Sequence, residues 1–401
     1  MSVGTYVHLA AKGPQELLMY GTDPGGPFSS CYKRHTRFAI DTKEHGFPDG
    51  CEFGKETRLV IPRDGDMLGG IVLEFHLPAV PGAAPTDAWV DAIGYVLFRR
   101  IKFVIDEIEI SNTERLWYDI ADRLFLKEAH KAGMDAMIGR NRVLPLTRPH
   151  VIYVPLKLFS CKAHRDTQHF FPLLTAPGST MSLTLELESF ANCVTSYAGS
   201  LPPTQVTAHA LVDYVLVEPA ERERMINRPH TLLIETEQDA EEVTYKEFLS
   251  MDGGDARVPV DTVKIDLSEV NYPVKYIVWV VYANNAVLTK SYFTYLDEIK
   301  ESRLLLDGVE RFSSQDGGYF QLVEHFTKGR RVTAGDGVYL YSFALDASSW
   351  QPCGHLTFGE VGKPVLDVML KEKRSDRIVK AFVVGSKFVD IQRGRVTVRY
   401  S

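Results

Sequence analysis

The stretch Ile101–Ile110 reads IKFVIDEIEI and alternates apolar and polar residues over much of its length. A period of two is typical of a β-strand that buries one face and exposes the other. The same alternation occurs in Ser182–Glu188 and Val396–Tyr400, and short apolar runs recur at Arg58–Ile61 and Gly70–Leu77. The sequence therefore predicts a chain built largely from short strands.

Turn-forming residues separate these runs. Pro24–Pro27, Arg63–Asp66, Asp252–Asp255 and Asp336–Gly337 supply Gly, Asp and Pro, which tolerate turn conformations. Within the second of them, Asp64-Gly65 lies between two apolar runs and predicts a hairpin turn.

Helical spacing is confined to two candidate segments, Asn112–Lys131 and Glu221–Ile226. We therefore expect helix to be a minor fraction of an all-β fold, arranged as sandwiches or barrels.

The length of 401 residues predicts two domains or one large all-β body. A polar segment with a proline near each end, Val217–Pro229, predicts the boundary between two halves. Val154–Phe159 and Tyr272–Ile277 each place Pro before an apolar run that contains Lys, which is weak evidence for an internal repeat.

The composition, with 45% hydrophobic and 24% charged residues, excludes a disordered, collagen-like or coiled-coil chain. A net charge of −7 argues against a surface that binds polyanions as a whole. The apolar run Tyr276–Ala283 is too short to span a bilayer, and the first residues do not resemble a secretory signal. Five cysteines without a CxxC motif predict reduced thiols rather than a disulfide scaffold: Cys31, Cys51, Cys161, Cys193 and Cys353.

Motifs for common enzyme classes are absent, including the P-loop, Gly-x-Ser-x-Gly and His-Glu-x-x-His. Cys161, His164 and His169, with Asp166, have a spacing that could suit zinc, but a polar loop after a strand is the favoured interpretation. Asp252-Gly-Gly-Asp255 lacks the register of a calcium loop, so a plain turn is favoured there. We predict no catalytic, cofactor-binding or metal-binding residues.

Two further charge patterns have alternative interpretations. Glu107 with Glu109 and Glu186 with Glu188 could act as paired catalytic carboxylates, but strand neighbours at i and i+2 are more simply a solvated face. The C-terminal stretch is basic, and it could contact nucleic acid, anionic lipid or a neighbouring acidic subunit, or simply be solvated. Its basic residues are Lys371, Lys373, Arg374, Arg377, Lys380, Lys387, Arg393, Arg395 and Arg399.

A family resemblance adds to these patterns. It begins with Leu9–Gly21 and Cys31–Ala39, the latter reading CYKRHTRFA, and continues in order through most of the chain. Later matches are Leu59–Met67, His76–Pro78, Tyr153–Cys161, Phe171–Leu174, Asn271–Val281, Arg311-Phe312, Tyr319-Phe320, Val338–Leu345 and Trp350–Gly354. Together they resemble the double jelly-roll major capsid proteins of nucleocytoplasmic large DNA viruses and their relatives. Cys353 and His355 depart from the Ser-Gly-Thr sequence that the family usually has around Gly354. The short chain predicts small surface loops.

The resemblance implies an all-β fold of two consecutive eight-stranded jelly-roll sandwiches with short helices in loops. It implies an N-terminal arm over residues 1–25, a first jelly roll over 26–218 and a second over 219–401. The arm would extend beneath the capsid subunit toward neighbouring subunits or an inner viral membrane.

The implied function is that of a major capsid protein that trimerises into pseudo-hexagonal capsomers and tiles the icosahedral shell of a double-stranded DNA virus. Expected partners are further copies of the chain, minor capsid and vertex proteins and an inner viral membrane, with no specific nucleic-acid binding. The protein would be made in the host cytoplasm, assembled in the infected cell and located in the virion. Alternatives are a minor or vertex capsid protein of the same fold and a jelly-roll sugar-binding protein.

Overall fold

The computed structural model describes most of the chain from residue 35 onward. The described residues are 35–160, 170–197, 199, 202–239, 243–244, 260–329, 335, 337–374, 376–392 and 394–399. Phe38–Ser401 form one compact unit, separate from Met1–Arg37. The described strands and helices all belong to Phe38–Ser401.

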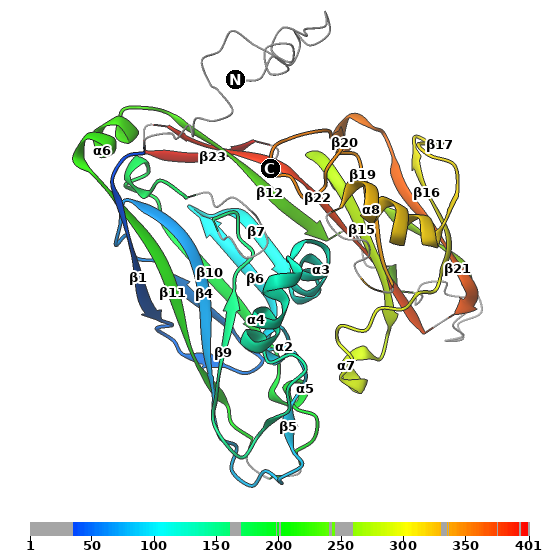
Figure 1. Ribbon diagram of the computed structural model, residues 1–401, viewed down its shortest axis with the longest axis horizontal. Helices are drawn as coiled ribbons and strands as arrows, with labels where there is room; N and C mark the ends of the chain where they lie inside the picture. The colour runs from blue at the N-terminus through cyan, green and yellow to red at the C-terminus, as the bar shows by residue number, and fades with distance from the viewer. Residues whose placement is uncertain are drawn as a thin grey trace, which may run out of the picture. The chain divides into compact units, whose positions relative to one another are not determined.

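The first half of this unit folds into a sandwich of two antiparallel sheets (Figure 1). One sheet has the order β1 (Phe38–Gly46), β11 (Gln205–Val217), β4 (Met67–Leu77) and β9 (His150–Pro155). The other has the order β3 (Glu56–Val60), β10 (Met181–Leu187), β6 (Phe98–Ile105) and β7 (Ile108–Glu114). Short strands add to the rim: β2 (Cys51–Glu52) on β11, and the pair β5 (Ala88–Trp89) and β8 (Leu144–Pro145).

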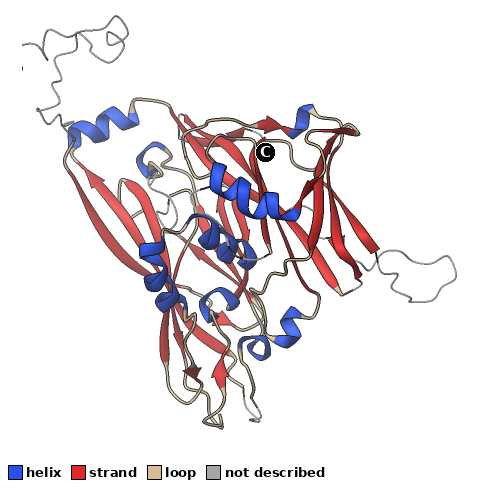
Figure 2. Cartoon of the chain, turned by 45° about the vertical axis from the view of Figure 1, so that its right-hand side comes forward, coloured by secondary structure: helices blue, strands red, loops and turns tan. Residues whose placement is uncertain are grey.

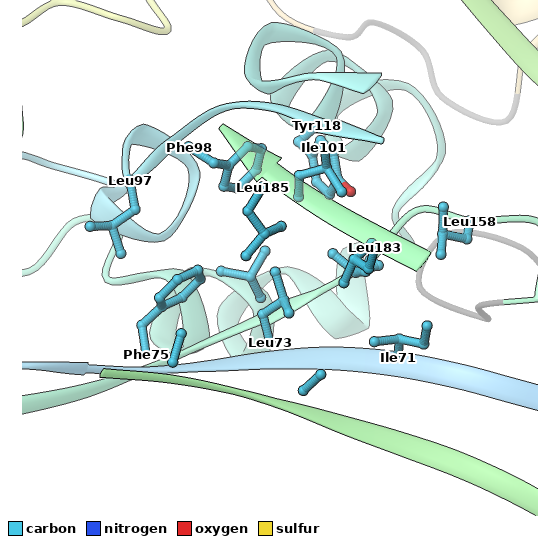
Figure 3. Close-up of a cluster of buried hydrophobic side chains, with 14 of the residues drawn as sticks. Ile71, Leu73, Phe75, Leu97, Phe98, Ile101, Tyr118, Leu158, Leu183 and Leu185 are labelled. Atoms are coloured by element: carbon cyan, nitrogen blue, oxygen red, sulfur yellow. The ribbon is translucent and has the colours of Figure 1, made fainter. Parts of the chain in front are cut away.

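Alternate residues of these strands fill the space between the two sheets. Leu73 and Phe75 of β4 point toward Leu183 and Leu185 of β10, and all four side chains are fully buried (Figure 3). The period of two that was read from Ser182–Glu188 is thus the period of core-facing side chains, and the burial pattern of β4 follows it as well.

The stretch Ile101–Ile110 is not one strand but a hairpin. It contains the end of β6, the turn residues Asp106 and Glu107, and the start of β7. Both turn residues have positive φ, 49° and 71°, which fits a two-residue hairpin turn of the primed type. The predicted pairing of Glu107 with Glu109 on one strand face is therefore wrong, because Glu107 lies in the turn.

The predicted hairpin turn at Asp64-Gly65 is also wrong. β3 before it pairs with β10, whereas β4 after it pairs with β11 and β9, so the segment crosses from one sheet to the other. Arg63 stabilises this crossing by donating a hydrogen bond to the carbonyl oxygen of Ser179 at 2.9 Å. An Asp-Gly pair supplies a reversal of the chain, but it does not decide which strands pair.

The second half of the unit forms another sandwich. One sheet has the order β12 (His230–Asp239), β22 (Arg377–Gln392), β15 (Pro273–Ala283) and β19 (Val338–Ser342). β13 (Val243–Thr244) and β23 (Arg395–Arg399) pair with β22, and β20 (Leu356–Thr357) pairs with β15. The opposite sheet has the order β14 (Val260–Asp266), β21 (Pro364–Arg374), β16 (Ile299–Leu306) and β17 (Val309–Glu310), with β18 (Gln315–Asp316) also on β16. Its core centres on Trp279, whose ring lies 5.0 Å from that of Phe320 and 6.1 Å from that of Tyr339.

The two sandwiches share one strand order. The order β1-β11-β4-β9 of the first sandwich corresponds to the order β12-β22-β15-β19 of the second. In each order the first strand pairs with the last long strand, β11 or β22. The final member, β9 or β19, is the strand that follows the helical connection. This confirms the predicted all-β fold of two consecutive jelly rolls. The proposed repeat of Val154–Phe159 and Tyr272–Ile277 does not follow that correspondence. The first segment ends β9, whose counterpart is β19, whereas the second enters β15, whose counterpart is β4.

Helices are short and lie in the connections (Figure 2). They are α2 (Ile93–Val96), α3 (Arg115–Phe125), α4 (Glu128–Ile138), α5 (Phe190–Cys193), α6 (Pro219–Ile226), α7 (Ala286–Thr289) and α8 (Glu324–Lys328). The π-helical turn η3 (Tyr319–Val323) leads directly into α8, and 3-10 turns occur at η2 (Leu173–Thr175) and η4 (Phe358–Glu360).

The predicted helix over Asn112–Lys131 is present as two helices rather than one. Leu126 and Lys127 have extended backbones, which separate α3 from α4. The predicted helix over Glu221–Ile226 is confirmed as part of α6, which has Pro219 in its first turn. Within the described part of the chain, no helix is long and apolar enough to cross a membrane.

Candidate functional site

Two segments were weighed as metal sites, although the sequence favours a polar loop and a plain turn there. Cys161, His164, Asp166 and His169 lie outside the described residues, as does Asp252–Asp255. Among the residues that are described, no group of three or more His, Cys, Asp or Glu side chains could hold a metal ion.

Glu188 differs from the solvated carboxylate that the sequence predicted. It follows the end of β10, and its side chain is only 1% exposed. Arg99 and Arg115 contact its two oxygens at 3.0 and 2.8 Å, and Asn192 donates a hydrogen bond at 3.0 Å. Burial alone would raise the pKa of Glu188, but these hydrogen bonds, one from the Ser189 backbone and the charge of Arg115 lower it to about 2.

Glu188 therefore forms a buried contact that joins the end of β10 to β6 and α3. Arg99 and Arg115 lie 89 and 73 residues before it in the chain, so local spacing offered no signal for the contact. Its neighbour Glu186 remains partly exposed on β10.

Much of the basic C-terminal stretch is paired with acidic side chains of the same chain. Ion pairs join Lys371 to Asp297 at 2.9 Å, Arg377 to Glu298 at 2.7 Å, Arg399 to Asp390 at 2.6 Å, and Lys380 to Glu114. Lys387 lies over the ring of Tyr272, and burial lowers the pKa of its ammonium group. Arg393 lies outside the described residues. Several of these charges thus hold strands together rather than form a continuous cationic surface.

The principal structural site is the junction between the sandwiches, formed by α3 of the first against the β12–β22–β15–β19 sheet of the second. The apolar face of α3 buries a continuous cluster on that sheet. Trp117 lies with its ring 5.5 Å from that of Phe382, and Phe125 lies 5.6 Å from Tyr276. The other buried members are Leu116, Ile120, Ala121, Leu124, Val278, Val280, Tyr295, Val338, Leu340, Ala347 and Val384.

Polar contacts fix the position of α3 along this sheet. Glu114, at the N-cap of α3, forms an ion pair with Lys380 of β22, which is 5% exposed. One residue earlier, Thr113 donates a hydrogen bond to Glu237 of β12. Because these groups are largely desolvated, loss of one partner would leave the other buried and uncompensated.

The loop of the second sandwich that contains Tyr292, Phe293 and Tyr295 covers the other side of the junction. Arg115 lies over the ring of Tyr292, whose hydroxyl donates to the carbonyl oxygen of Asn192 at 2.7 Å. Arg123 donates to the carbonyl oxygen of Phe293 at 2.8 Å and lies over the ring of Tyr295. Burial raises the pKa of the Tyr295 hydroxyl well above its usual value, so this side chain stays neutral.

A second buried charge network lies beneath α3. Lys157, fully buried after β9, forms an ion pair with Asp122. Asp122 also accepts a hydrogen bond from the Tyr95 hydroxyl at 2.6 Å, and Arg140 pairs with Asp119 one helical turn earlier. These contacts attach α3 to its own sandwich, so the helix is held rigidly from both sides.

Two surfaces contrast with this buried junction because they leave apolar side chains in solvent. The α8 segment, defined as Tyr319–Lys328, exposes 51% of Leu322, 45% of Val323 and 72% of Phe326. The β1–β11–β4–β9 sheet exposes 46% of Val151 and 37% of Tyr153 on the side opposite its core.

Comparison with known proteins shows which family the chain resembles along its length. A family model described as the major capsid protein N-terminus matches residues 27–218. A second, described as the large eukaryotic DNA virus major capsid protein, matches residues 221–398. This chain belongs to the major capsid proteins of large eukaryotic DNA viruses. The resemblance noted from the sequence motifs is thereby confirmed.

Full-length major capsid proteins are among the relatives. The chain is 24% identical to that of Pyramimonas orientalis virus, with 99% of each chain covered. It is 25% identical to that of Paramecium bursaria Chlorella virus 1, with 96% of this chain and 91% of the relative covered.

Solved capsid proteins share the fold. PBCV-1 VP54 superimposes with a TM-score of 0.77 at 23% identity, covering 93% of this chain and 99% of VP54. The Faustovirus major capsid protein gives a TM-score of 0.70 at 10% identity, covering 94% and 96% of the two chains. The arrangement of the two sandwiches is thus retained where most residues differ.

Proposed function

We propose that this major capsid protein trimerises into a pseudo-hexagonal capsomer, and that capsomers tile the icosahedral shell of a double-stranded DNA virus. The observation that carries the proposal is the pair of sandwiches with one strand order, held in a single compact unit by the α3 junction. Three copies of such a chain present six similar sandwiches, an outline suited to a hexagonal lattice.

The role is structural and needs no catalysis. The ionisable groups with the clearest partners, such as Glu188 and Lys380, hold elements of the fold together. Burial of the two sandwich cores and of the junction gives the rigidity that a shell subunit requires. The virion is the location that family membership implies, and we propose synthesis in the host cytoplasm and assembly in the infected cell.

We further propose a division into an N-terminal arm over residues 1–25, a first jelly roll over 26–218 and a second over 219–401. The arm lies outside the described residues. In this proposal it reaches beneath the capsomer toward neighbouring capsomers or an inner membrane, while minor capsid and vertex proteins bind at capsomer edges. Removal of residues 1–25 is expected to leave trimers intact but to impair shell assembly.

The deciding experiment is light scattering of the purified full chain behind a sizing column, followed by negative-stain imaging. We expect three times the chain mass of 45.1 kDa and pseudo-hexagonal particles. A stable monomer that forms no shell would contradict the proposal. A low copy number per virion, measured by quantitative mass spectrometry, would indicate a minor or vertex protein instead.

A further inference from the structure

A lysine and an aspartate meet in the interior of the first sandwich, beneath α3. Lys157 lies just after β9 and 35 residues after Asp122 of α3. Nζ of Lys157 contacts Oδ1 of Asp122, and the two side chains are 0% and 3% exposed. In the ion pairs of Lys275 and Lys380 the carboxylates are 11% and 19% exposed. The Lys157–Asp122 pair is therefore the most fully removed from water of these three.

Aromatic rings enclose the amine of this pair. Nζ of Lys157 lies 6.0 Å from the ring centroid of Tyr95 and 5.7 Å from that of Tyr118, and both tyrosines are fully buried. Such surroundings solvate an ammonium group and a carboxylate poorly, so the attraction between the two charges must offset a large loss of hydration. A reaction that removes both charges at once relieves that cost.

The two oxygens of Asp122 have different surroundings. Oδ1 faces the amine of Lys157, whereas Oδ2 accepts a hydrogen bond from the Tyr95 hydroxyl at 2.6 Å. Burial, together with the charge of Asp122, raises the pKa of Tyr95 well above its usual value, so the hydroxyl keeps its proton. One oxygen is thus held by a permanent donor while the other is in contact with a nucleophile.

We propose that Lys157 and Asp122 condense to an isopeptide bond in the folded chain. Nζ attacks Cγ of Asp122, the bond from Cγ to Oδ1 breaks, and the two protons that Nζ gives up leave with Oδ1 as water. Oδ2 becomes the amide carbonyl oxygen and keeps its hydrogen bond from Tyr95. The step needs no oxidant, reductant or cofactor, because an ammonium group and a carboxylate contain every atom of the amide and the water.

The fold supplies the means of reaction. Contact between oriented groups in one molecule corresponds to effective concentrations of about 10⁵–10⁸ M. The Tyr95 hydroxyl lies where negative charge develops on Oδ2 of the tetrahedral intermediate, and a fixed donor at that point stabilises the charge. The released water has an outlet, because Asp122 also lines a cavity with Arg140 and Phe293.

The bond would tie the junction helix to its own sandwich covalently. It would close a loop from Asp122 to Lys157 that contains α4 and β9. A cross-link of this kind restricts the unfolded chain, so α3 would stay attached to the end of β9 even when the first sandwich opens. This inference goes beyond the proposed function, because it concerns a single chain and holds whatever that chain assembles into.

The intact mass of the full chain tests the bond directly. The purified protein is unfolded in acid, which preserves an amide but breaks every ion pair, and its mass is measured by electrospray ionisation. We expect a mass lower by one water molecule than the mass calculated from the sequence. Because unfolded single chains are measured, the result does not depend on whether the protein trimerises.

Tryptic digestion locates the bond. Trypsin cleaves after a free Lys157 but not after an acylated one, so the linked product joins residues 116–123 to residues 143–162. Lys157→Arg keeps a cation at this position but forms no isopeptide bond, and it should have its full calculated mass. Lys380→Arg is the matched control at another buried pair, and it should still lack one water molecule.

The role of Tyr95 is tested by the rate of linkage. Tyr95→Phe removes only the hydroxyl and should slow condensation by about 100-fold, as loss of one oxyanion donor does. The linked fraction is followed by digestion at intervals after cell-free synthesis, with thermal unfolding as the check that the variant folds. Linkage at the wild-type rate in this variant would overturn the role given to Tyr95.

Two results would overturn the isopeptide bond itself. One is a wild-type chain with its full calculated mass and free peptides that end at Lys157. The other is a missing water molecule that persists in Lys157→Arg, because the loss would then lie elsewhere in the chain. A linked chain that never trimerises would contradict the proposed function and leave the bond standing, whereas trimers of unlinked chains would do the reverse.

Discussion

Replacement of Trp117 by alanine should separate the unfolding of the two sandwiches. Trp117 projects from α3 of the first sandwich, is 4% exposed and packs against Phe382 of the second. Truncation of a buried Trp costs about 3–5 kcal/mol, because both the transfer free energy and the packing around the cavity are lost. The free energy that is lost belongs to the contact between the two sandwich cores and not to the packing inside either core.

The expected result has two parts. At fixed protein concentration, the free energy of unfolding should fall by about 3–5 kcal/mol, and a single calorimetric transition should resolve into two. Fixed concentration matters because self-association adds to apparent stability. Leu288→Ala, at a side chain that is 82% exposed, should change the free energy of unfolding by about 0.5 kcal/mol or less.

Two results would refute this reasoning. A loss below about 1 kcal/mol in Trp117→Ala would mean that the junction relaxes around the cavity or contributes little to stability. A larger loss with one unbroken transition would mean that other contacts, such as Lys380 with Glu114, suffice to couple the sandwiches.

Three further perturbations test the polar groups and one close backbone approach. Burial lowers the pKa of His325 from 6.5 to about 4, so wild-type stability should be lost as pH falls from about 6.5 to about 4. Relative to His325→Gln, this loss should amount to about 3 kcal/mol in pH-dependent urea unfolding, and parallel curves would contradict it. Glu188→Gln should cost about 3 kcal/mol at pH 7 by leaving Arg99 and Arg115 uncompensated. Because the Glu188 pKa is lowered from 4.5 to about 2, that difference should vanish between those pH values, and a constant difference would refute the assignment. Gly385→Ala should lower the melting temperature by several degrees, since a Cβ there would collide with the Pro273 carbonyl oxygen, whereas Gly133→Ala, with open space around it, should not.

Strand identity could largely be predicted from local pattern, because alternation reports which face of a strand is buried. The runs at Arg58–Ile61, Gly70–Leu77 and Ser182–Glu188 correspond to β3, β4 and β10 within a few residues. Pairing could not be predicted in this way. Alternation continued through the turn of the β6–β7 hairpin, and Asp64-Gly65 turned out to link different sheets.

The junction was harder to predict than the strands. The spacing of Leu116, Ile120 and Leu124 indicated an amphipathic helix, but that pattern does not specify what the apolar face will contact. Lys380 lies 266 residues from its partner Glu114, so the ion pair has no local signature. The family resemblance supplied the two-sandwich architecture that local patterns left open between sandwich and barrel.

The α3 junction also constrains where a shell can bend. The helix is bound on one side to its own sandwich through Lys157 and Asp122, and on the other to the second sandwich through a continuous apolar cluster. The angle between the two sandwiches is therefore set during folding of each chain. Curvature must then arise at contacts between chains, so the radius of the particle is a property of those contacts and not of the subunit itself.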